Sequence, residues 1–508
     1  MVLAYSSYNK IVQKTTKQTQ DIDKKRQKKT MKINSQRLLQ ILTKFVKFVG
    51  PGIMVSVAYM DPGNYSTSVS GGAQYKYQLL FSVFISNIFA VLLQCLCVKL
   101  GTVTGRDLAE NCHLYLPRWL NLTLYFFAEL AIIATDLAEV VGTAVALEIL
   151  FGIPLIYGVI FTILDVLVIL IFYDPDETNM KKVRTFEIFV SCLVGATCLC
   201  FLLEMFKITI PDKRELFRGA LPSKIIFKEE QALYISLGIL GATVMPHSLY
   251  LGSSIVKPRL HEYDYKKYGK IPARPSLSAI NYCLNYSYVE LIISLFVIAS
   301  FVNSAILIVA GASLSGRPEA SDADLLSIYE LLSQYISPAA GLIFALAMLS
   351  SGQSSGIICT MAGQIVSEGF IQWSLPPWAT RLCTRLMAIA PCLFVTFTIG
   401  EHGITEVLNF SQVVLSLILP LVAAPLIYFT ANRKMMTVTD EFGELEDSEN
   451  TSDTTVTETT PLNANGKRVQ DFTNSKWLTW TSVAVWLTIS SLNCYLVIVY
   501  LMGGDVHF

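Results

Sequence analysis

The chain has 508 residues, of which 53% are hydrophobic and 15% charged, and its formal net charge is zero. This composition, with a mean hydropathy of +0.49, excludes an ordinary soluble globular protein and indicates a membrane protein. The eleven cysteines lie mostly inside apolar segments, so they indicate no disulfide framework.

The amino-terminal segment is strongly basic. The first 49 residues contain twelve Lys or Arg against only Asp21 and Asp23, with no apolar run that could form the core of a signal peptide. We expect residues 1–44 to be an uncleaved, disordered cytosolic tail. A basic tail can also bind nucleic acid, but orienting a membrane protein or contacting anionic lipid already accounts for these charges, so we expect no nucleic-acid partner.

Eleven stretches are long and apolar enough to cross a bilayer as a helix, which takes about 20 residues. They cover residues 45–73, 79–104, 121–150, 154–173, 184–207, 230–257, 284–312, 338–372, 377–399, 404–431 and 477–502. The predicted fold class is therefore an all-α polytopic membrane protein, with ten helices in residues 45–431 and an eleventh at 477–502. Residues 432–476 are rich in Thr, Glu, Asp and Asn, and we expect them to form a disordered polar loop.

The distribution of basic residues predicts the orientation. Six Lys or Arg lie in the loop 257–274, whereas the opposite loops 152–154 and 400–403 contain none. The positive-inside rule places the amino terminus, this loop and residues 432–476 in the cytosol. The odd number of spans then leaves 503–508 as a short tail on the far, luminal side.

The first span is interrupted. It begins as an apolar helix and then reads Met60-Asp61-Pro62-Gly63-Asn64, and proline followed by glycine breaks the hydrogen-bond ladder of a helix. A carboxylate at this depth costs about 3 kcal/mol or more unless something compensates for its charge. A bound cation would do so; the alternative is that Asp61 only caps the second half-helix.

The sixth span is broken in a matching way, at Ala242-Thr243-Val244-Met245-Pro246. The first and sixth spans hold the same position in two successive groups of five, which predicts an inverted repeat of five plus five helices and one more. Interrupted helices at corresponding positions of two halves indicate a transport site at the membrane midplane.

The side chains at the two breaks predict the ligand. Asp61 offers a carboxylate, Asn64 an amide oxygen, the backbone near Ala242 a freed carbonyl and Met245 a thioether. Oxygen ligands alone suit magnesium or calcium, whereas sulfur shifts the preference toward softer ions such as iron(II) or manganese(II). A methionine in a membrane helix is also ordinary packing, so the interpretation depends on its place beside the helix-breaking proline.

Three motifs together resemble the NRAMP family of proton-coupled divalent metal transporters: Asp61-Pro62-Gly63-Asn64, Met245-Pro246-His247, and the stretch from Gly352-Gln353-Ser354-Ser355 to Ala362-Gly363-Gln364. The resemblance covers residues 40–430, and its details are similar to the fungal, vacuolar-type branch. It implies a LeuT-like fold with alternating access, transport of metal ions with protons, and no resident cofactor. It also implies a vacuolar membrane location, with plasma membrane or endosome as alternatives.

The resemblance implies site residues as well. Asp61, Asn64, Met245 and the carbonyl of Ala242 are expected to bind metal, joined by Gln412 in the tenth span. The alternative for Gln412 is an ordinary hydrogen bond between helices.

A proton route is predicted in the third span, where Glu129, Asp136 and Glu139 occupy one face of an apolar helix. Arg381 and Arg385 in the ninth span, four residues apart, are candidate countercharges. The resemblance assigns the proton role to these groups and to His247; the alternative is a buried structural ion-pair network. One departure matters, because Gly252 stands where the family often has a second histidine.

Two other functions fit parts of the pattern. An amino-acid or organic-cation symporter on the same fold would take a substrate carboxylate and sodium at the exposed backbone, and would not need Asp61 and Met245 together. A metal-sensing receptor would bind without transport. An enzyme is not expected, because the sequence pairs no nucleophile with a base and has no phosphate loop. Protein partners are not indicated.

Overall fold

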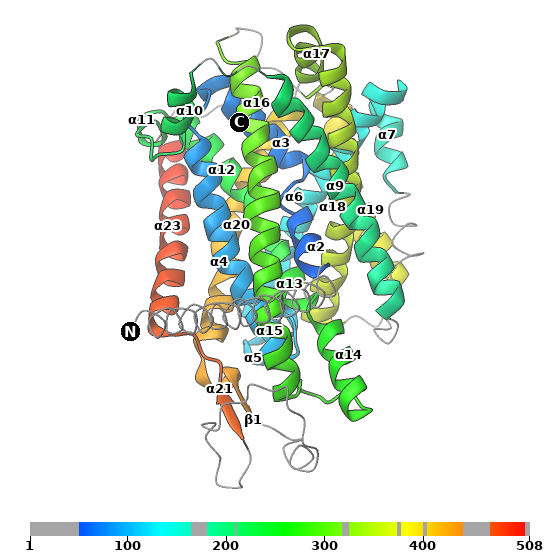
Figure 1. Cartoon of the computed structure of the whole chain (residues 1–508), viewed down its shortest axis with the longest axis vertical. Coiled ribbons are helices and arrows are strands. Elements are labelled where there is room, and N and C mark those ends of the chain that lie inside the picture. Colours follow the sequence, from blue (N-terminus) through cyan, green and yellow to red (C-terminus); the bar gives the residue numbers. More distant parts are fainter. Residues whose placement is uncertain are drawn as a thin grey trace, which may run out of the picture. The chain divides into compact units, whose positions relative to one another are not determined.

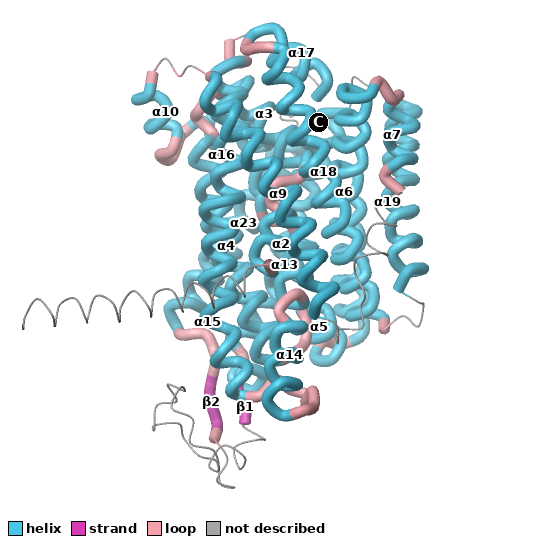
Figure 2. Tube along the Cα trace, turned by 45° about the vertical axis from the view of Figure 1, so that its right-hand side comes forward, coloured by secondary structure: helices cyan, strands magenta, loops and turns pink. Residues whose placement is uncertain are grey.

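A computed structural model of the chain describes residues 50–163, 180–208, 210, 212–316, 325–372, 377–399, 404–439 and 468–502. Within these ranges most residues are helical, and the long helices run side by side along roughly one direction (Figure 1). The only strands among the described residues are two short ones at one end of the bundle (Figure 2). Eight of the described helices are long and apolar enough to span a bilayer. The predicted all-α membrane fold class is confirmed.

The helices of the first half of the core begin at Pro51. They are α2 (Pro51–Val57), α3 (Pro62–Tyr75), α4 (Leu80–Thr104), α5 (Leu108–Tyr115), α6 (Arg118–Phe151), α7 (Leu155–Phe161) and α9 (Met180–Lys207). The two short helices α10 (Lys213–Gly219) and α11 (Ile225–Lys228) connect this half to the next.

The second half contains both long spans and short connecting helices. They are α12 (Glu230–Thr243), α13 (Pro246–Ser254), α14 (Lys257–Tyr268), α15 (Leu277–Ile293), the π-helical turn η1 (Ser294–Ala299), α16 (Ser300–Ser313), α17 (Leu325–Tyr335), α18 (Pro338–Ile371), α19 (Pro377–Ile399) and α20 (Ile404–Ala431). The last helix is α23 (Lys476–Leu501). Because η1 joins α15 to α16 without a gap, these three elements form one long span.

Three of the eleven predicted spans do not appear among the eight. The first is split into α2 and α3, each too short to cross alone, because Pro62 and Gly63 end the first half-helix. For the fourth, residues 164–179 lie outside the described part of the chain. In the ninth, the apolar section of α19 covers only Arg385–Phe394. The count of eleven stays a prediction.

The structure differs from the expectation of disorder at both ends of the loop 432–476. Helix α21 (Arg433–Met436) leads into strand β1 (Thr437–Thr439), which pairs antiparallel with β2 (Val469–Asp471). Composition predicts disorder for the whole segment, but local packing overrides it at these ends. The backbone N–H of Phe472 donates to the Met436 carbonyl at 3.0 Å. The side chain of Asn474 donates to Thr430 at 2.9 Å and accepts from Lys99 at 2.8 Å.

The two ends of the bundle carry different short elements. Helices α5, α14 and α21 and strand β1 lie at one end, and α10 and α17 lie at the other (Figure 1). We call these the α14 end and the α17 end. The first half-helix α2 is anchored toward the α14 end, where the backbone N–H of Gly50 donates to Glu290 at 2.5 Å. A buried ion pair joins Arg259 of α14 to Glu187 of α9 at 2.9 Å.

Candidate metal site

The non-helical segment at the first helix break is stabilised by hydrogen bonds from side chains on neighbouring helices. Helix α2 ends at Val57 and α3 begins at Pro62, so the carbonyls of residues 58–60 lose their helical partners, whereas that of Asp61 accepts from the N–H of Asn64 at 3.0 Å. The Asn303 side chain on α16 donates to the Tyr59 carbonyl at 2.9 Å. The Ser351 hydroxyl on α18 donates to the Met60 carbonyl. These contacts stabilise a non-helical segment that would be costly in a membrane without them.

The second break lies between Thr243, the last residue of α12, and Pro246, the first residue of α13. Met245 is fully buried with extended backbone, and its carbonyl accepts from the N–H of Ser248 at 3.1 Å. The two breaks are in direct contact, because the Asn64 side-chain nitrogen donates to the Ala242 carbonyl at 2.9 Å. The prediction that the two interrupted helices meet agrees with this geometry.

Asp61 uses its two carboxylate oxygens differently. Oδ1 accepts from the backbone N–H of Asn64 at 2.9 Å and from its side-chain nitrogen at 2.6 Å, which makes Asp61 the cap of α3. Oδ2 is buried and accepts no hydrogen bond from any described residue. A buried carboxylate oxygen without a partner is costly. Capping therefore accounts for one oxygen and leaves the other available to a cation.

Gln412 approaches the same break from α20. A Cβ atom added at Gly63 would overlap the Gln412 amide and lie 2.9 Å from Asp61 Oδ2, so the absent side chain of Gly63 makes room for both groups. The Gln412 nitrogen donates to Ser411 of its own helix at 3.2 Å. Its Oε1 is buried, and no described residue donates to it. The Gln412 amide thus lies beside Gly63 and Asp61, with its nitrogen nearest to Gly63.

The side chain of Asn64 presents a different atom to the helix break than the sequence predicts. We expect its amide oxygen as a ligand, but its nitrogen bridges Asp61 Oδ1 and the Ala242 carbonyl. Both of these oxygens are also ligands that a cation accepts. Rotation of the Asn64 amide would present its oxygen to a bound cation and release the two oxygens.

Thr243 is a polar residue at the break that the sequence reasoning missed. Its hydroxyl is buried, and no described residue bonds to it. A threonine in an apolar run carries no separate signal, because such hydroxyls usually bond to their own helix. Only the end of α12 at this residue leaves the hydroxyl beside the break.

His247 contacts the third span rather than a second histidine. Its Nδ1 lies 3.3 Å from the Thr135 hydroxyl of α6. A side chain at Gly252 would overlap Gln94 of α4. The nitrogen of Gln94 donates to the Tyr59 hydroxyl at 2.9 Å and to the Ser248 hydroxyl at 2.9 Å. A glutamine therefore fills the space beside Gly252.

The third-span carboxylates are all buried on α6. Asp136 forms a buried ion pair with Arg385 of α19, as the candidate countercharge predicts. The side chain of Arg381 lies outside the described residues. Ligand atoms of Asp136, Glu139 and Cys359 lie within 4.8 Å of one another. Sequence reasoning missed Cys359, which α18 brings against the third span. Glu129 lies seven residues before Asp136 on α6 and is not part of this cluster.

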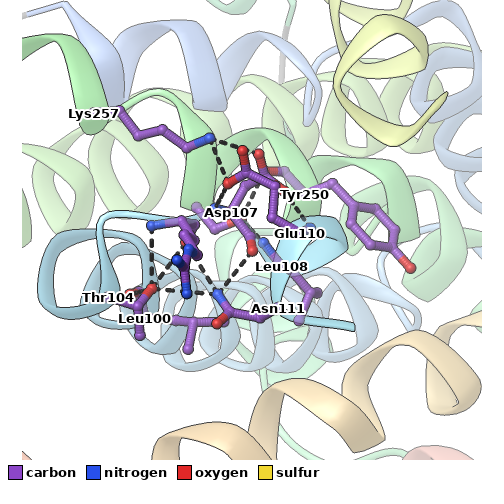
Figure 3. A network of polar contacts seen from close by, with 10 residues as sticks. Leu100, Thr104, Asp107, Leu108, Glu110, Asn111, Tyr250 and Lys257 are labelled. Carbon is purple, nitrogen blue, oxygen red and sulfur yellow. Dashed lines mark hydrogen bonds and ion pairs between the residues drawn. The ribbon is translucent and has the colours of Figure 1, made fainter. Parts of the chain in front are cut away.

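A second polar network joins α5, α13 and α14 (Figure 3). The Lys257 ammonium lies 2.7 Å from Asp107 and 2.8 Å from Glu110, which together form a capping box on α5. The Leu108 N–H donates to the Ser253 hydroxyl of α13 at 2.9 Å. Burial, and then the neighbouring Asp107, raise the pKa of Glu110, which the ammonium opposes. These contacts tie α5 to the half-helix that follows the second break.

Comparison with known proteins identifies the family. The family model described as Nramp, natural resistance-associated macrophage protein-like, matches residues 52–440. The iron transporter SMF3 of Saccharomyces cerevisiae is 75% identical over 470 residues, which cover 92% of this chain and 99% of that protein.

Solved structures agree. A variant of the manganese transporter of Eremococcus coleocola is 31% identical with a TM-score of 0.73, covering 92% of this chain and 90% of that one. MhsT in complex with L-phenylalanine is 12% identical with a TM-score of 0.50, covering 88% and 97%, which bears on the fold alone and supports the LeuT-like class. The chain belongs to the Nramp family.

Proposed function

We propose that the chain is a secondary active transporter, with no resident cofactor, that moves iron(II) and manganese(II) together with protons into the cytosol by alternating access. One observation carries the metal site. The carboxylate oxygen Asp61 Oδ2 is buried without a hydrogen-bond donor among the described residues, and it lies beside Gly63 together with the Gln412 side-chain amide, whose Oε1 is also buried without a donor. Such oxygens are stabilised by a cation.

The donor set favours transition metals over magnesium and calcium. Asp61, Gln412 and the Ala242 carbonyl supply hard oxygen ligands, and Met245 at the second break supplies sulfur. Mixed oxygen and sulfur ligation suits the softer divalent ions. The relatives point the same way, since one is named an iron transporter and another a manganese transporter.

The third span supports proton coupling. Asp136 directly follows Thr135 on α6, and Glu139 lies one turn beyond Thr135. Thr135 contacts His247, which is two residues beyond Met245. A chain of polar groups thus leads away from the metal site through the bundle. Ionisable groups inside a membrane protein commonly mark a proton route. An inside-negative potential adds about 2.3 kcal/mol per charge per 100 mV for a cation entering the cytosol.

The orientation follows from the charges near the α14 end. Gly50 is the first residue that the structure describes. Twelve basic residues precede it in the sequence, within residues 1–49. The loop 257–274 contributes six more. The segment 207–228 toward the α17 end also holds six, at Lys207, Lys213, Arg214, Arg218, Lys224 and Lys228. The tail therefore decides the balance, and it favours the α14 end in the cytosol.

The discriminating experiment is uptake by vesicles that contain the purified full-length chain. We expect uptake of manganese(II) and iron(II) that increases when the outside is acidified and is accompanied by acidification inside. Empty vesicles are the control. Sodium-driven uptake of phenylalanine without metal uptake would instead identify an amino-acid symporter, and tight manganese binding without uptake would identify a receptor.

The vacuolar membrane is the location that the sequence resemblance favours. If the α14 end faces the cytosol there, the transporter releases stored metal rather than importing it from outside. Fluorescence of a tagged chain, combined with iron measured in isolated vacuoles, tests this. Deletion of the gene should raise vacuolar iron, whereas unchanged vacuolar iron with lowered uptake by whole cells would place the transporter in the plasma membrane.

A further inference from the structure

Glu204 on α9 is a buried carboxylate that the proposed metal and proton routes do not use. It is 1% exposed, and neither of its side-chain oxygens has a hydrogen-bond partner among the described residues. It lines a small cavity of about 10 Å³ between five helices. The other lining residues are all apolar: Val69, Phe201, Ile306, Val309, Ala310, Leu314, Ile328, Leu332 and Phe344.

The charges around this cavity are few. The lining positions contributed by α3, α16, α17 and α18 are apolar. Lys207, one turn further along α9, is exposed and attracts the Glu204 carboxylate electrostatically, but among the described residues it forms no ion pair with it. Tyr65 of α3 and Cys200 of α9 are titratable groups that interact electrostatically with Glu204, and the hydroxyl of Tyr65 donates to the Ala347 carbonyl at 3.2 Å. Glu330 on α17 is exposed and does not line the cavity.

These surroundings favour a proton over a metal ion as the ligand of Glu204. A divalent ion takes about six oxygen ligands, and the cavity offers one carboxylate and room for at most about one water molecule. An ionised carboxylate without a partner is costly in an apolar cavity, whereas the neutral acid is not. The cavity in this structure therefore accommodates Glu204 with a proton bound.

The cavity occupies a position where opening would change the environment of Glu204. It lies toward the α17 end, against α17 and the second half of α3. Val69 is eight residues beyond Asp61 on α3, about 12 Å along the helix axis. Between them, the ring of Tyr65 contacts Phe201 at 5.2 Å and Phe344 at 6.0 Å between centroids. This aromatic cluster separates the cavity from the metal site.

We propose that Glu204 is a second proton-binding site, distinct from the third-span carboxylates, whose protonation is required for α3, α9 and α17 to close over the metal site. When these helices separate, water reaches the carboxylate and stabilises its ionised form. Closure returns the group to the apolar cavity and takes up a proton from the α17 side. Acid on that side therefore favours the closed state.

The first experiment measures manganese uptake by vesicles of the full-length chain as the pH on the α17 side varies from 5 to 7.5; this arm rests on the proposed transport function. The protonated fraction of a hydrated glutamate falls about tenfold per pH unit above its ordinary pKa. We expect the uptake of manganese by the wild type to decline toward neutral pH by at most about tenfold per pH unit. Glu204→Gln, which is always neutral, should show a markedly shallower decline.

Two matched variants sharpen this comparison. Glu330→Gln makes the same change at an exposed site of α17 and should keep the wild-type slope. Glu204→Asp keeps an ionisable group and should restore the slope that Glu204→Gln loses. An unchanged slope in Glu204→Gln, or a loss of slope in Glu330→Gln as well, would overturn the proposal.

The second experiment detects the proton itself, in purified protein without metal. Infrared spectroscopy resolves the carbonyl stretch of a protonated carboxylic acid. Wild type and Glu330→Gln should share a band that Glu204→Gln lacks, and an identical spectrum in all three proteins would overturn the proposal. If vesicles with the wild-type chain take up no metal, the proposed transport function is wrong. The infrared band of the protonated acid then still shows whether Glu204 holds a proton.

Discussion

Replacing Asp61 by Asn separates the capping role that the structure shows for this side chain from the metal-binding role that we propose for it. Asn is as good a helix cap as Asp, and its side-chain oxygen can still accept from the backbone N–H of Asn64, 2.9 Å away from Asp61 Oδ1. The substitution keeps the size of the side chain and removes only its charge. It also replaces the buried Oδ2, which has no donor among the described residues, by an uncharged amide nitrogen, whose burial costs less than that of a carboxylate oxygen.

The expected effects on stability and on metal binding therefore have opposite signs. Without metal, Asp61→Asn should be as stable as the wild type or more stable. When the Asp61 charge is removed, the bound metal ion loses a buried charge partner. This loss weakens the binding free energy of manganese by about 3 kcal/mol, or raises its Kd roughly a hundredfold. At a manganese concentration a hundred times the wild-type Kd, bound metal stabilises the wild type by about 2.7 kcal/mol, whereas the variant should gain only about 0.4 kcal/mol.

Thermal unfolding in detergent, with and without manganese(II), measures both quantities. Asp212→Asn is a matched control, because Asp212 caps α10 through the Arg214 N–H at 2.8 Å in an exposed position. It should keep the full metal-dependent rise in Tm. The reasoning is refuted if Asp61→Asn keeps that rise too, since Asp61 would then only cap α3. A large loss of stability without metal would equally contradict it.

Two further substitutions test the other groups at the break. Met245→Ala should keep part of the manganese uptake but lower the preference for manganese over calcium by about tenfold or more, which is about 1.4 kcal/mol, because the sulfur ligand is lost. Competition between the two ions for uptake into vesicles measures this preference. An unchanged preference would mean that the thioether contributes only packing. Gly63→Ala should displace the Gln412 amide and weaken manganese binding by about 1 to 3 kcal/mol. Titration calorimetry compares it with Gly195→Ala, where an added Cβ meets no atom within 4 Å.

The sequence predicts the helix breaks well because their causes are local. Pro62 and Pro246 lack the backbone N–H that continues a helix, and each follows a residue with extended backbone, Asp61 and Met245. Both breaks interrupt otherwise apolar runs whose length alone indicates a membrane span. The structure places the breaks where these signals lie.

Features that depend on contacts between distant segments escape sequence reasoning. Whether Asn64 presents its side-chain nitrogen or its oxygen to the site depends on the Ala242 carbonyl, which is 178 residues away in the sequence. The ordered ends of the loop 432–476 depend on Asn474, which bonds to the end of α20 and to α4. Composition averages over a segment, so it cannot detect a few residues that pack against the bundle.

The departure at Gly252 sharpens where protons can travel. Gln94 fills the space beside Gly252 and bonds to Tyr59 and Ser248, which links α4 to both helix breaks. An amide has no ionisable form in this pH range, so it cannot hold a proton in place of a histidine. In the described part of the chain, His247 has a polar contact with Thr135 of α6. If protons accompany the metal, as we propose, this contact directs their route toward the third span, where Asp136 pairs with Arg385 of α19.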